Sequence, residues 1–100
     1  MKIIITDEAM ADIRTIYEYI YNNLQNPAAA ETFSEKIFRS CNRLSLYPNM
    51  GVSLREKTGV DSDSRCLMCG NYIAFYRILS DTVRIDRIVD GRTEYMKTIF

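Results

Sequence analysis

The sequence of 100 residues contains no histidine, the side chain that most often acts as a general acid or base near neutral pH. Histidine is also the commonest protein ligand for metal ions, so a metal site would need other donors. The four glycines are spread between residues 51 and 91 and form no glycine-rich loop for phosphate. The sequence therefore shows no complete catalytic constellation, and it predicts no metal and no cofactor.

Net charge and long apolar runs are also missing. Lys and Arg number 13 and Asp and Glu number 13, a balance that argues against binding nucleic acid through a broad basic face. The longest apolar runs are far shorter than a membrane span, and the N-terminus turns acidic at Asp7, before a signal-peptide core could form. We therefore expect a cytoplasmic protein without a membrane segment. Its length predicts one domain over residues 1–100.

Three cysteines are an odd number, which does not suit a disulfide framework. Two of them, Cys66 and Cys69, have the C-x-x-C spacing associated with thiol redox catalysis and zinc. They stand in a strand-like segment, and side chains three positions apart on a strand point to opposite faces of a sheet. Two such thiols cannot readily share a disulfide or a metal. We therefore predict two small structural residues beside a hairpin turn.

The N-terminal half predicts a short strand and two helices. Residues 2–6 form a β-branched run, and Thr6 or Asp7 can cap a helix that begins near Asp7 and has Asp12 away from its apolar stripe. Asn26-Pro27 stops this helix and starts another, because Asn is a good N-cap and Pro fits the first helical position. Each helix has one apolar stripe, which predicts a helical hairpin. The stripes hold Ala9, Ile13, Ile16, Tyr17, Ile20 and Leu24 in the first helix, and Ala30, Phe33, Ile37, Cys41 and Leu44 in the second.

The C-terminal half changes to the period of strands. Residues 52–63 are polar and predict a mobile loop. Three strand-like segments follow, joined by two-residue turns, and predict an antiparallel meander. The expected fold is α+β: a helical hairpin packs on one face of a small antiparallel sheet, which the N-terminal strand forms with the C-terminal three-stranded meander. The strand segments are 65–69, 72–79 and 82–89, and the turns are Gly70-Asn71 and Ser80-Asp81.

Both faces of the segment 72–79 are largely apolar, although two helices can cover only one face of a small sheet. The other face is then solvated, occupied by the C-terminal tail or covered by a partner, and a protein-binding groove has this character. Alternatively, the aromatic side chains only fill out the edges of the core. Five arginines on or beside the meander can pair with interleaved carboxylates or bind a partner. They are Arg65, Arg77, Arg84, Arg87 and Arg92.

Several short motifs occur in a fixed order along the chain. They are A-x-x-D-I-x-x-I-Y-E-Y-I in the first helix, L-x-x-Y-P-x-x-G after the second, R-x-L-x-x-G-N-Y-I-x-F-Y-R-I and V-R-I-x-R-I-x-D-G-R in the meander, and a terminal I-F. This ordered set, over essentially the whole chain, resembles the RelE/ParE superfamily of toxins from type II toxin–antitoxin systems, which includes plasmid stabilisation proteins. The resemblance implies a small cytoplasmic toxin in a hetero-oligomer with its cognate antitoxin, whose disordered C-terminal part folds on the toxin surface.

The superfamily implies two activities. RelE-like members are mRNA interferases that act on the ribosome, and they usually carry Lys or Arg in the strand before the hairpin and just after the turn tyrosine. This chain has Cys66, Met68 and Ile73 at those positions. Its neutral charge, long first helix and D-G-R ending favour ParE-like members, which poison DNA gyrase and have no known nucleolytic site. A non-toxic remnant that still binds its antitoxin is a third possibility.

The resemblance and the placement of arginine and aromatic residues together predict the functional side chains. Tyr72 and Tyr76 are expected to line the antitoxin groove. Under the RelE-like alternative, catalysis on ribosome-bound mRNA would draw on Arg65, Arg92 and Tyr95. Under the ParE-like interpretation, the residues that face DNA gyrase are Arg65, Arg77, Arg87, Arg92 and Tyr95.

Overall fold

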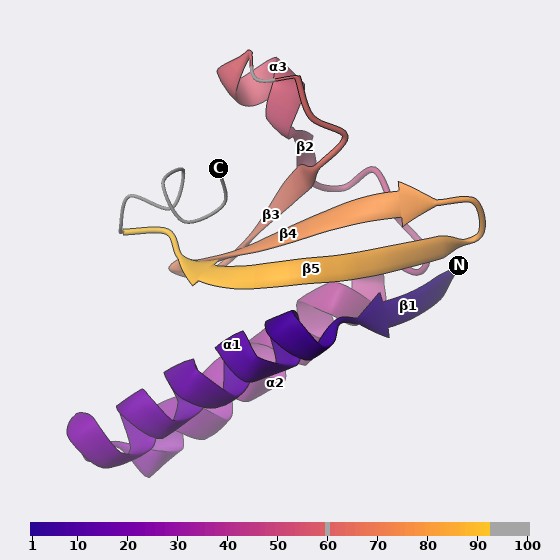
Figure 1. Cartoon of the computed structure of the whole chain (residues 1–100). Coiled ribbons are helices and arrows are strands. Elements are labelled where there is room, and N and C mark those ends of the chain that lie inside the picture. Colours follow the sequence, from indigo (N-terminus) through magenta and orange to yellow (C-terminus); the bar gives the residue numbers. More distant parts are fainter. Residues whose placement is uncertain (60, 93–100) are drawn as a thin grey trace.

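A computed structural model describes residues 1–59 and 61–92 of the chain, and Figure 1 shows its helices and strands. The predicted site residue Tyr95 lies outside the described residues. No helix in the described part is long and apolar enough to cross a bilayer. In chain order, the elements are β1 (Lys2–Ile5), α1 (Asp7–Glu18), the π-helical turn η1 (Tyr19–Asn23), α2 (Pro27–Arg43), β2 (Val52–Ser53), α3 (Leu54–Thr58), β3 (Arg65–Cys69), β4 (Tyr72–Leu79) and β5 (Thr82–Asp90).

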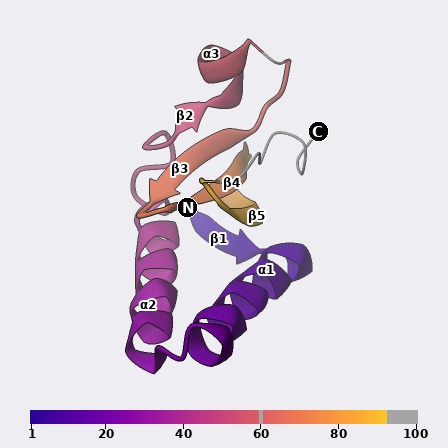
Figure 2. The same ribbon diagram turned by 90° about the vertical axis from the view of Figure 1, so that its left-hand side faces the viewer.

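The sheet has the strand order β1-β5-β4-β3-β2. β3, β4 and β5 form the predicted antiparallel meander, and the N-terminal strand β1 joins it in parallel with β5. α1 and α2 lie side by side on one face of this sheet, as Figures 1 and 2 show. The predicted α+β architecture is therefore confirmed.

Both long helices begin at the residues that the sequence indicates, because side-chain oxygens cap them. The Oγ1 atom of Thr6 accepts a hydrogen bond from the backbone N–H of Ala9 at 3.1 Å and donates one to a backbone carbonyl of β5. In α2, Oδ1 of Asn26 accepts from the N–H of Ala29 at 3.1 Å, and Pro27 occupies the first turn. The Thr6 cap also fixes α1 to the sheet.

The end of the first helix departs from the predicted stripe. α1 stops at Glu18, and the chain continues as the π-helical turn η1, which is wider than an α-helix and changes the phase of the side chains. Ile20 is still buried, whereas Leu24 is 56% exposed. The prediction that Leu24 extends the buried stripe is wrong, because it assumes the α-helical period throughout.

The main core fills the space between the α1–α2 hairpin and the sheet. It joins the apolar stripes of both helices to one face of the meander, and fully burying one large apolar side chain contributes about 1.5–3 kcal/mol. Side chains on β4 alternate between the two faces, and Ala74 and Tyr76 belong to this core. The buried members are Ala9, Ile13, Ile20, Ala30, Phe33, Ile37, Cys41, Leu44, Cys69, Ala74, Tyr76, Val83, Ile85 and Ile88.

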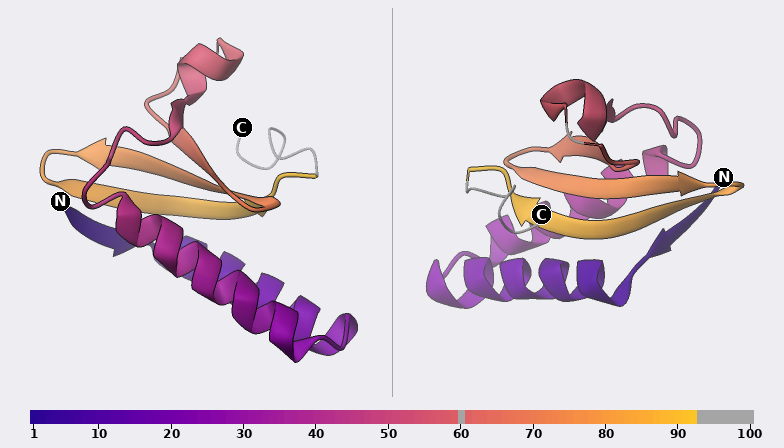
Figure 3. Two further views of the ribbon diagram at one scale, coloured as in Figure 1. Left: turned by 180° about the vertical axis from the view of Figure 1, so that it is seen from behind. Right: turned by 45° about the horizontal axis from the view of Figure 1, so that its top comes forward.

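A second apolar layer, which we call the α3 layer, lies on the opposite face of the sheet. Figure 3 shows α3 on the side of the sheet away from the α1–α2 hairpin. The prediction of a mobile loop over residues 52–63 is wrong, because this segment contains β2 and α3. One buried leucine anchors α3, and a single apolar residue gives no periodic signal in the sequence. The layer consists of Leu54, Cys66, Ile73, Phe75 and Val89.

Candidate functional site

The arginines predicted to face a target do not form one surface. Arg65 and Arg77 line the same pocket, where β3 begins and β4 ends. Arg92 follows the end of β5, beside the first residue of β4 and so at the opposite end of that strand. Arg87 stands on β5 beyond the residues that pair with β1. The structure therefore separates the predicted set into three places.

Arg87 joins α1 to the edge of β5. Its Nε and Nη2 atoms donate to the two carboxylate oxygens of Asp12 at 2.8 and 3.1 Å, and the backbone N–H of Ile88 donates to the same carboxylate at 2.9 Å. The hydrogen bonds to Asp12 raise the pKa of Arg87. Asp12 was expected away from the buried stripe, yet its side chain is only 17% exposed. The guanidinium fork of Arg87 is therefore already occupied.

Arg92 folds back on Asp90 at the end of β5. Its Nε and Nη2 atoms donate to the carboxylate at 2.9 and 2.8 Å, and these hydrogen bonds lower the pKa of Asp90. The guanidinium also lies over the ring of Tyr72, with 5.9 Å from Cζ to the ring centroid, which is a cation–π distance. Arg92 is thus held between a carboxylate and an aromatic ring.

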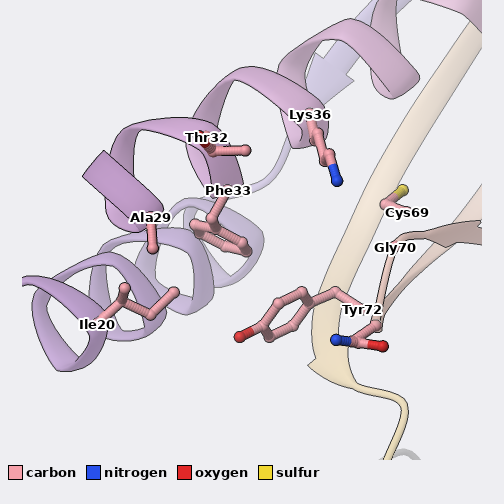
Figure 4. A pocket seen from close by; sticks show the side chains of 9 residues that line it. Ile20, Ala29, Thr32, Phe33, Lys36, Cys69, Gly70 and Tyr72 are labelled. Carbon is pink, nitrogen blue, oxygen red and sulfur yellow. The ribbon is translucent and has the colours of Figure 1, made fainter. Parts of the chain in front are cut away.

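Tyr72 lines a groove between α2 and the β3–β4 turn, which we call the hairpin groove (Figure 4). Its volume of about 360 Å³ lies at the lower end of the range for ligand pockets. Phe33 meets Tyr72 edge to face, with ring centroids 4.8 Å apart. Burial raises the pKa of Tyr72, so its hydroxyl stays protonated. The lining residues are Ile20, Ala29, Thr32, Phe33, Lys36, Cys69, Gly70, Asn71 and Tyr72.

The hairpin groove combines apolar walls with one cation. In Figure 4, Ile20 and Phe33 stand near the Tyr72 ring, and Lys36 extends from α2 toward Cys69. Such a surface suits a partner segment that presents an apolar side chain next to an acidic one. Sequence reasoning predicted Tyr72 and missed Lys36. The only signal was the three-residue spacing from Phe33, which puts both side chains on one side of α2.

Tyr76, predicted for the same groove, is fully buried and does not line it. Its hydroxyl donates to the carbonyl of Pro48 at 2.7 Å and accepts from the N–H of Gly51 at 3.0 Å. A Cβ atom at Gly51 would lie 2.7 Å from both the Tyr76 hydroxyl and the Cys66 carbonyl, so glycine permits this close approach. Tyr76 therefore fixes the loop after α2, and the prediction of a groove position for it is wrong.

Arg65 and Arg77 line a polar pocket of about 370 Å³, which we call the arginine notch. Nη2 of Arg65 donates to the carbonyls of Asn49 at 3.1 Å and Gly51 at 2.6 Å. Nε of Arg77 lies 3.8 Å from Oδ2 of Asp86, too far for a hydrogen bond. The pocket is lined by Ser53, Arg55, Ser62, Asp63, Arg65, Arg77, Ile78 and Leu79.

Cys66 and Cys69 lie on opposite faces of the sheet, as alternation predicts. Cys66 belongs to the α3 layer and Cys69 to the main core. All three thiols are free, and burial raises the pKa of Cys41 to about 12 and also raises the pKa of Cys66 and of Cys69. A raised pKa disfavours the thiolate that nucleophilic or redox chemistry needs. Within residues 1–59 and 61–92, no three metal-ligating side chains come together.

Comparison with known proteins connects this fold to one family. A solved structure described as "Chromosomal ParDE TA system from P. aeruginosa" matches with a TM-score of 0.74 and 24% sequence identity, over 90% of this chain and 95% of that chain. At this identity the likeness shows the fold alone. No curated protein matches the chain. A family model described as "ParE toxin of type II toxin-antitoxin system, parDE" matches residues 3–95. Because that match covers most of its length, the chain belongs to the ParE toxin family of type II toxin–antitoxin systems.

Proposed function

We propose that this chain is the toxin of a ParDE-type pair, that it binds and inhibits DNA gyrase, and that a cognate antitoxin neutralises it. Family membership supports the toxin role, and the ParDE description of the similar solved structure supports a paired antitoxin. In this proposal the chain acts in the cytoplasm by binding, without turnover, and is held inactive in a toxin–antitoxin hetero-oligomer.

The α3 layer is the observation that favours gyrase over mRNA. RelE-like ribonucleases, which the sequence also resembles, usually carry Lys or Arg at the positions held here by Cys66, Met68 and Ile73. Cys66 and Ile73 are buried in the α3 layer beneath Leu54. An unpaired charge at either place would lose its hydration and cost several kcal/mol. Cys66 and Ile73 therefore serve packing, and a cationic pair at these two positions is disfavoured.

The two arginines named for the ribonuclease alternative also lie in different parts of the fold. Arg65 binds two carbonyls of the loop after α2, and Arg92 binds Asp90. Their neighbours on β4, Tyr76 and Tyr72, are four residues apart, which corresponds to roughly 13 Å along a strand. Two cations so far apart do not converge on one scissile phosphate. This separation supports a binding function.

The predicted target-facing residues remain part of the proposal. Arg65 and Arg77 have unused donors and are the first candidates for contact with gyrase. Arg87 and Arg92 would have to exchange their present carboxylates for groups on the target. Tyr95 stays in the set as a prediction from the sequence.

A supercoiling assay with purified DNA gyrase tests the choice of target. The added protein should block supercoiling, and Arg77→Gln should weaken the inhibition, whereas Arg39→Gln, at an exposed arginine of α2, should leave it unchanged. Ribosomes translating a defined mRNA should show no cleavage. Cleaved mRNA with intact supercoiling would overturn the gyrase assignment, and inactivity in both assays with retained antitoxin binding would identify a non-toxic remnant.

The hairpin groove is the proposed antitoxin site, because it offers an apolar depression beside Tyr72. Ala29 lines the groove, and Ala28, its neighbour on α2, is exposed and does not. Ala29→Trp should fill the groove and weaken antitoxin binding by about tenfold or more while gyrase inhibition persists. Ala28→Trp is the matched control and should bind normally. Equal losses in both variants would place the antitoxin elsewhere.

A further inference from the structure

The arginine notch contains hydrogen-bond donors that nothing in the described chain satisfies. The Nε atoms of Arg65 and Arg77 are both buried, and neither has a hydrogen-bond partner among residues 1–59 and 61–92. A buried donor without an acceptor costs about 1–3 kcal/mol, and more when the group is charged. An unpaired buried donor calls for an explanation, and an acceptor from outside the chain, a water molecule or an ion, is one.

The shortage of acceptors has a visible cause on the neighbouring strand. Arg77 faces Arg84 across the β4–β5 ladder, so two like charges oppose each other. One carboxylate, Asp86, serves both. Its contact with Nε of Arg84 is 2.6 Å, whereas its contact with Nε of Arg77 is 3.8 Å. Asp86 is therefore committed to Arg84, and Arg77 keeps donors for a second anion.

The other charged residues at the notch do not supply the missing acceptors. Asp63 lines the notch, but it is 86% exposed and lies 3.9 Å from Arg55, which also pairs with Asp61 at 2.6 Å. Among residues 1–59 and 61–92, the acceptors that Arg65 binds are the neutral carbonyls of Asn49 and Gly51. Among the described residues that line this pocket, the cations thus outnumber the anions.

From these contacts we infer that the arginine notch binds a phosphate group. A carboxylate has two oxygens, and a single guanidinium fork can bind both of them, as Arg87 does with Asp12. The notch instead presents donors from separate segments: Arg65 and Arg77 on two strands, and the hydroxyl of Ser53 beside α3. Figure 1 shows β3 beside β4, with β3 rising toward α3 while β4 runs on to its turn with β5. A tetrahedral phosphate, with three or four oxygens, matches that convergence.

The inference concerns two arginines of the proposed target-facing set, but it stands without the gyrase assignment. Phosphate binding is measured on the purified protein with no target present. A failure to bind phosphate would leave the supercoiling result untouched, and a failure in the supercoiling assay would leave the phosphate site untouched.

Titration with inorganic phosphate, followed through the Nε–Hε resonances of the arginines at constant ionic strength, tests the site. The resonances of Arg65 and Arg77 should shift and saturate together. Arg77→Gln should weaken binding by about tenfold. Asp86→Asn should strengthen it severalfold, since it removes the competing carboxylate. The control Arg39→Gln should change nothing.

The backbone amide spectrum of each variant shows whether it has kept the fold. If Arg77→Gln disturbs the fold, the comparison of Asp86→Asn with the unaltered protein still decides the matter. The absence of a saturable shift at Arg65 and Arg77 would overturn the inference. An equal loss of binding in Arg39→Gln would do the same, because it would mean general attraction between charges.

The source of the phosphate is resolved by three further probes. A short oligothymidylate that binds through the same resonances identifies a nucleic-acid backbone, and phosphoserine that binds more tightly than the oligothymidylate identifies a phosphomonoester. A tetraglutamate peptide should bind more weakly than both. If it binds more tightly than either phosphate probe, the site is for carboxylates and the inference fails.

Discussion

The sheet carries two apolar layers of very different construction, one on each face. The main core joins the apolar stripes of α1 and α2 to the meander. The α3 layer consists of four side chains of the sheet and of Leu54, the buried residue of a helix of five residues. Many apolar contacts therefore define the first face, whereas Leu54 is the buried side chain that packs α3 on the second.

This contrast predicts where the molecule opens first. A helix of one or two turns is not stable through its own hydrogen bonds. The C-cap closes α3 itself: Gly59 adopts a positive φ of 77° and donates its N–H to the carbonyl of Arg55 at 2.8 Å. The N–H of Leu54 donates to the carbonyl of Ser64 at 2.9 Å. Local unfolding, which draws on the segments with the fewest buried contacts, should begin at α3 and leave the helical hairpin intact.

The largest expected effect comes from matched truncations on the two faces. Ile85 in the main core and Leu54 in the α3 layer are both 0% exposed and lose the same number of carbons when changed to alanine. Ile85→Ala should lower the free energy of unfolding by about 4 kcal/mol, because close packing on both sides leaves a cavity open. Leu54→Ala should cost about 2 kcal/mol, because a short helix can settle into the space. Urea denaturation followed by circular dichroism measures both, and equal losses would contradict the proposed contrast.

The same difference decided which parts of the fold the sequence could predict. The stripe containing Ile13 and Ile37 repeats over several turns, so the helices and their packing face were evident. α3 rests on Leu54 alone within a polar stretch, and no periodicity marks it. The prediction that Leu24 is buried was wrong for another reason. The π-helical turn changes the phase of the apolar stripe, although the stripe continues in the sequence without interruption.

The second prediction concerns Asp12, which connects α1 to β5 at the edge of the main core. Asp12→Ala should lower the free energy of unfolding by about 3 kcal/mol, because Arg87 loses its partner and the N–H of Ile88 loses its acceptor. Asp12→Asn keeps one acceptor oxygen and should cost about half as much. Thermal denaturation measures both. A loss below about 0.5 kcal/mol for Asp12→Ala would mean that this contact behaves as an exposed ion pair.

Asp12 also shows why the candidate site was harder to predict than the fold. Arginines can be counted from the sequence, but their partners depend on the folded chain: Arg87 binds Asp12, 75 positions away, whereas Arg92 binds Asp90 locally. Strand alternation placed Tyr72 and Tyr76 on the same face. It could not show that the loop after α2 covers Tyr76 and leaves Tyr72 beside an open groove.

A smaller effect is expected from Tyr76→Phe, which tests whether the main core supports the α3 side. The Tyr76 hydroxyl binds Pro48 and Gly51 in the loop that leads into β2 and α3. Its removal should cost about 1–2 kcal/mol and speed hydrogen exchange at the Gly51 amide. Tyr17→Phe is the control, since it removes a hydroxyl that binds Glu31 on the exposed surface, and should stay within about 0.5 kcal/mol. If the Gly51 amide exchanges at the same rate in both variants, the loop does not depend on Tyr76.

The smallest expected effect is a change in the alkylation rates of the cysteines, which lie on both faces of the sheet. In the native protein, all three thiols should react slowly with an alkylating reagent, because burial shields them and raises the pKa of each. In Leu54→Ala, alkylation of Cys66 should accelerate by about tenfold, since α3 opens more often, while Cys41 and Cys69 keep their native rates. Mass spectrometry of the labelled peptides separates the three sites. If all three thiols accelerate together, Leu54→Ala has destabilised the whole domain, and the two apolar layers open as one unit.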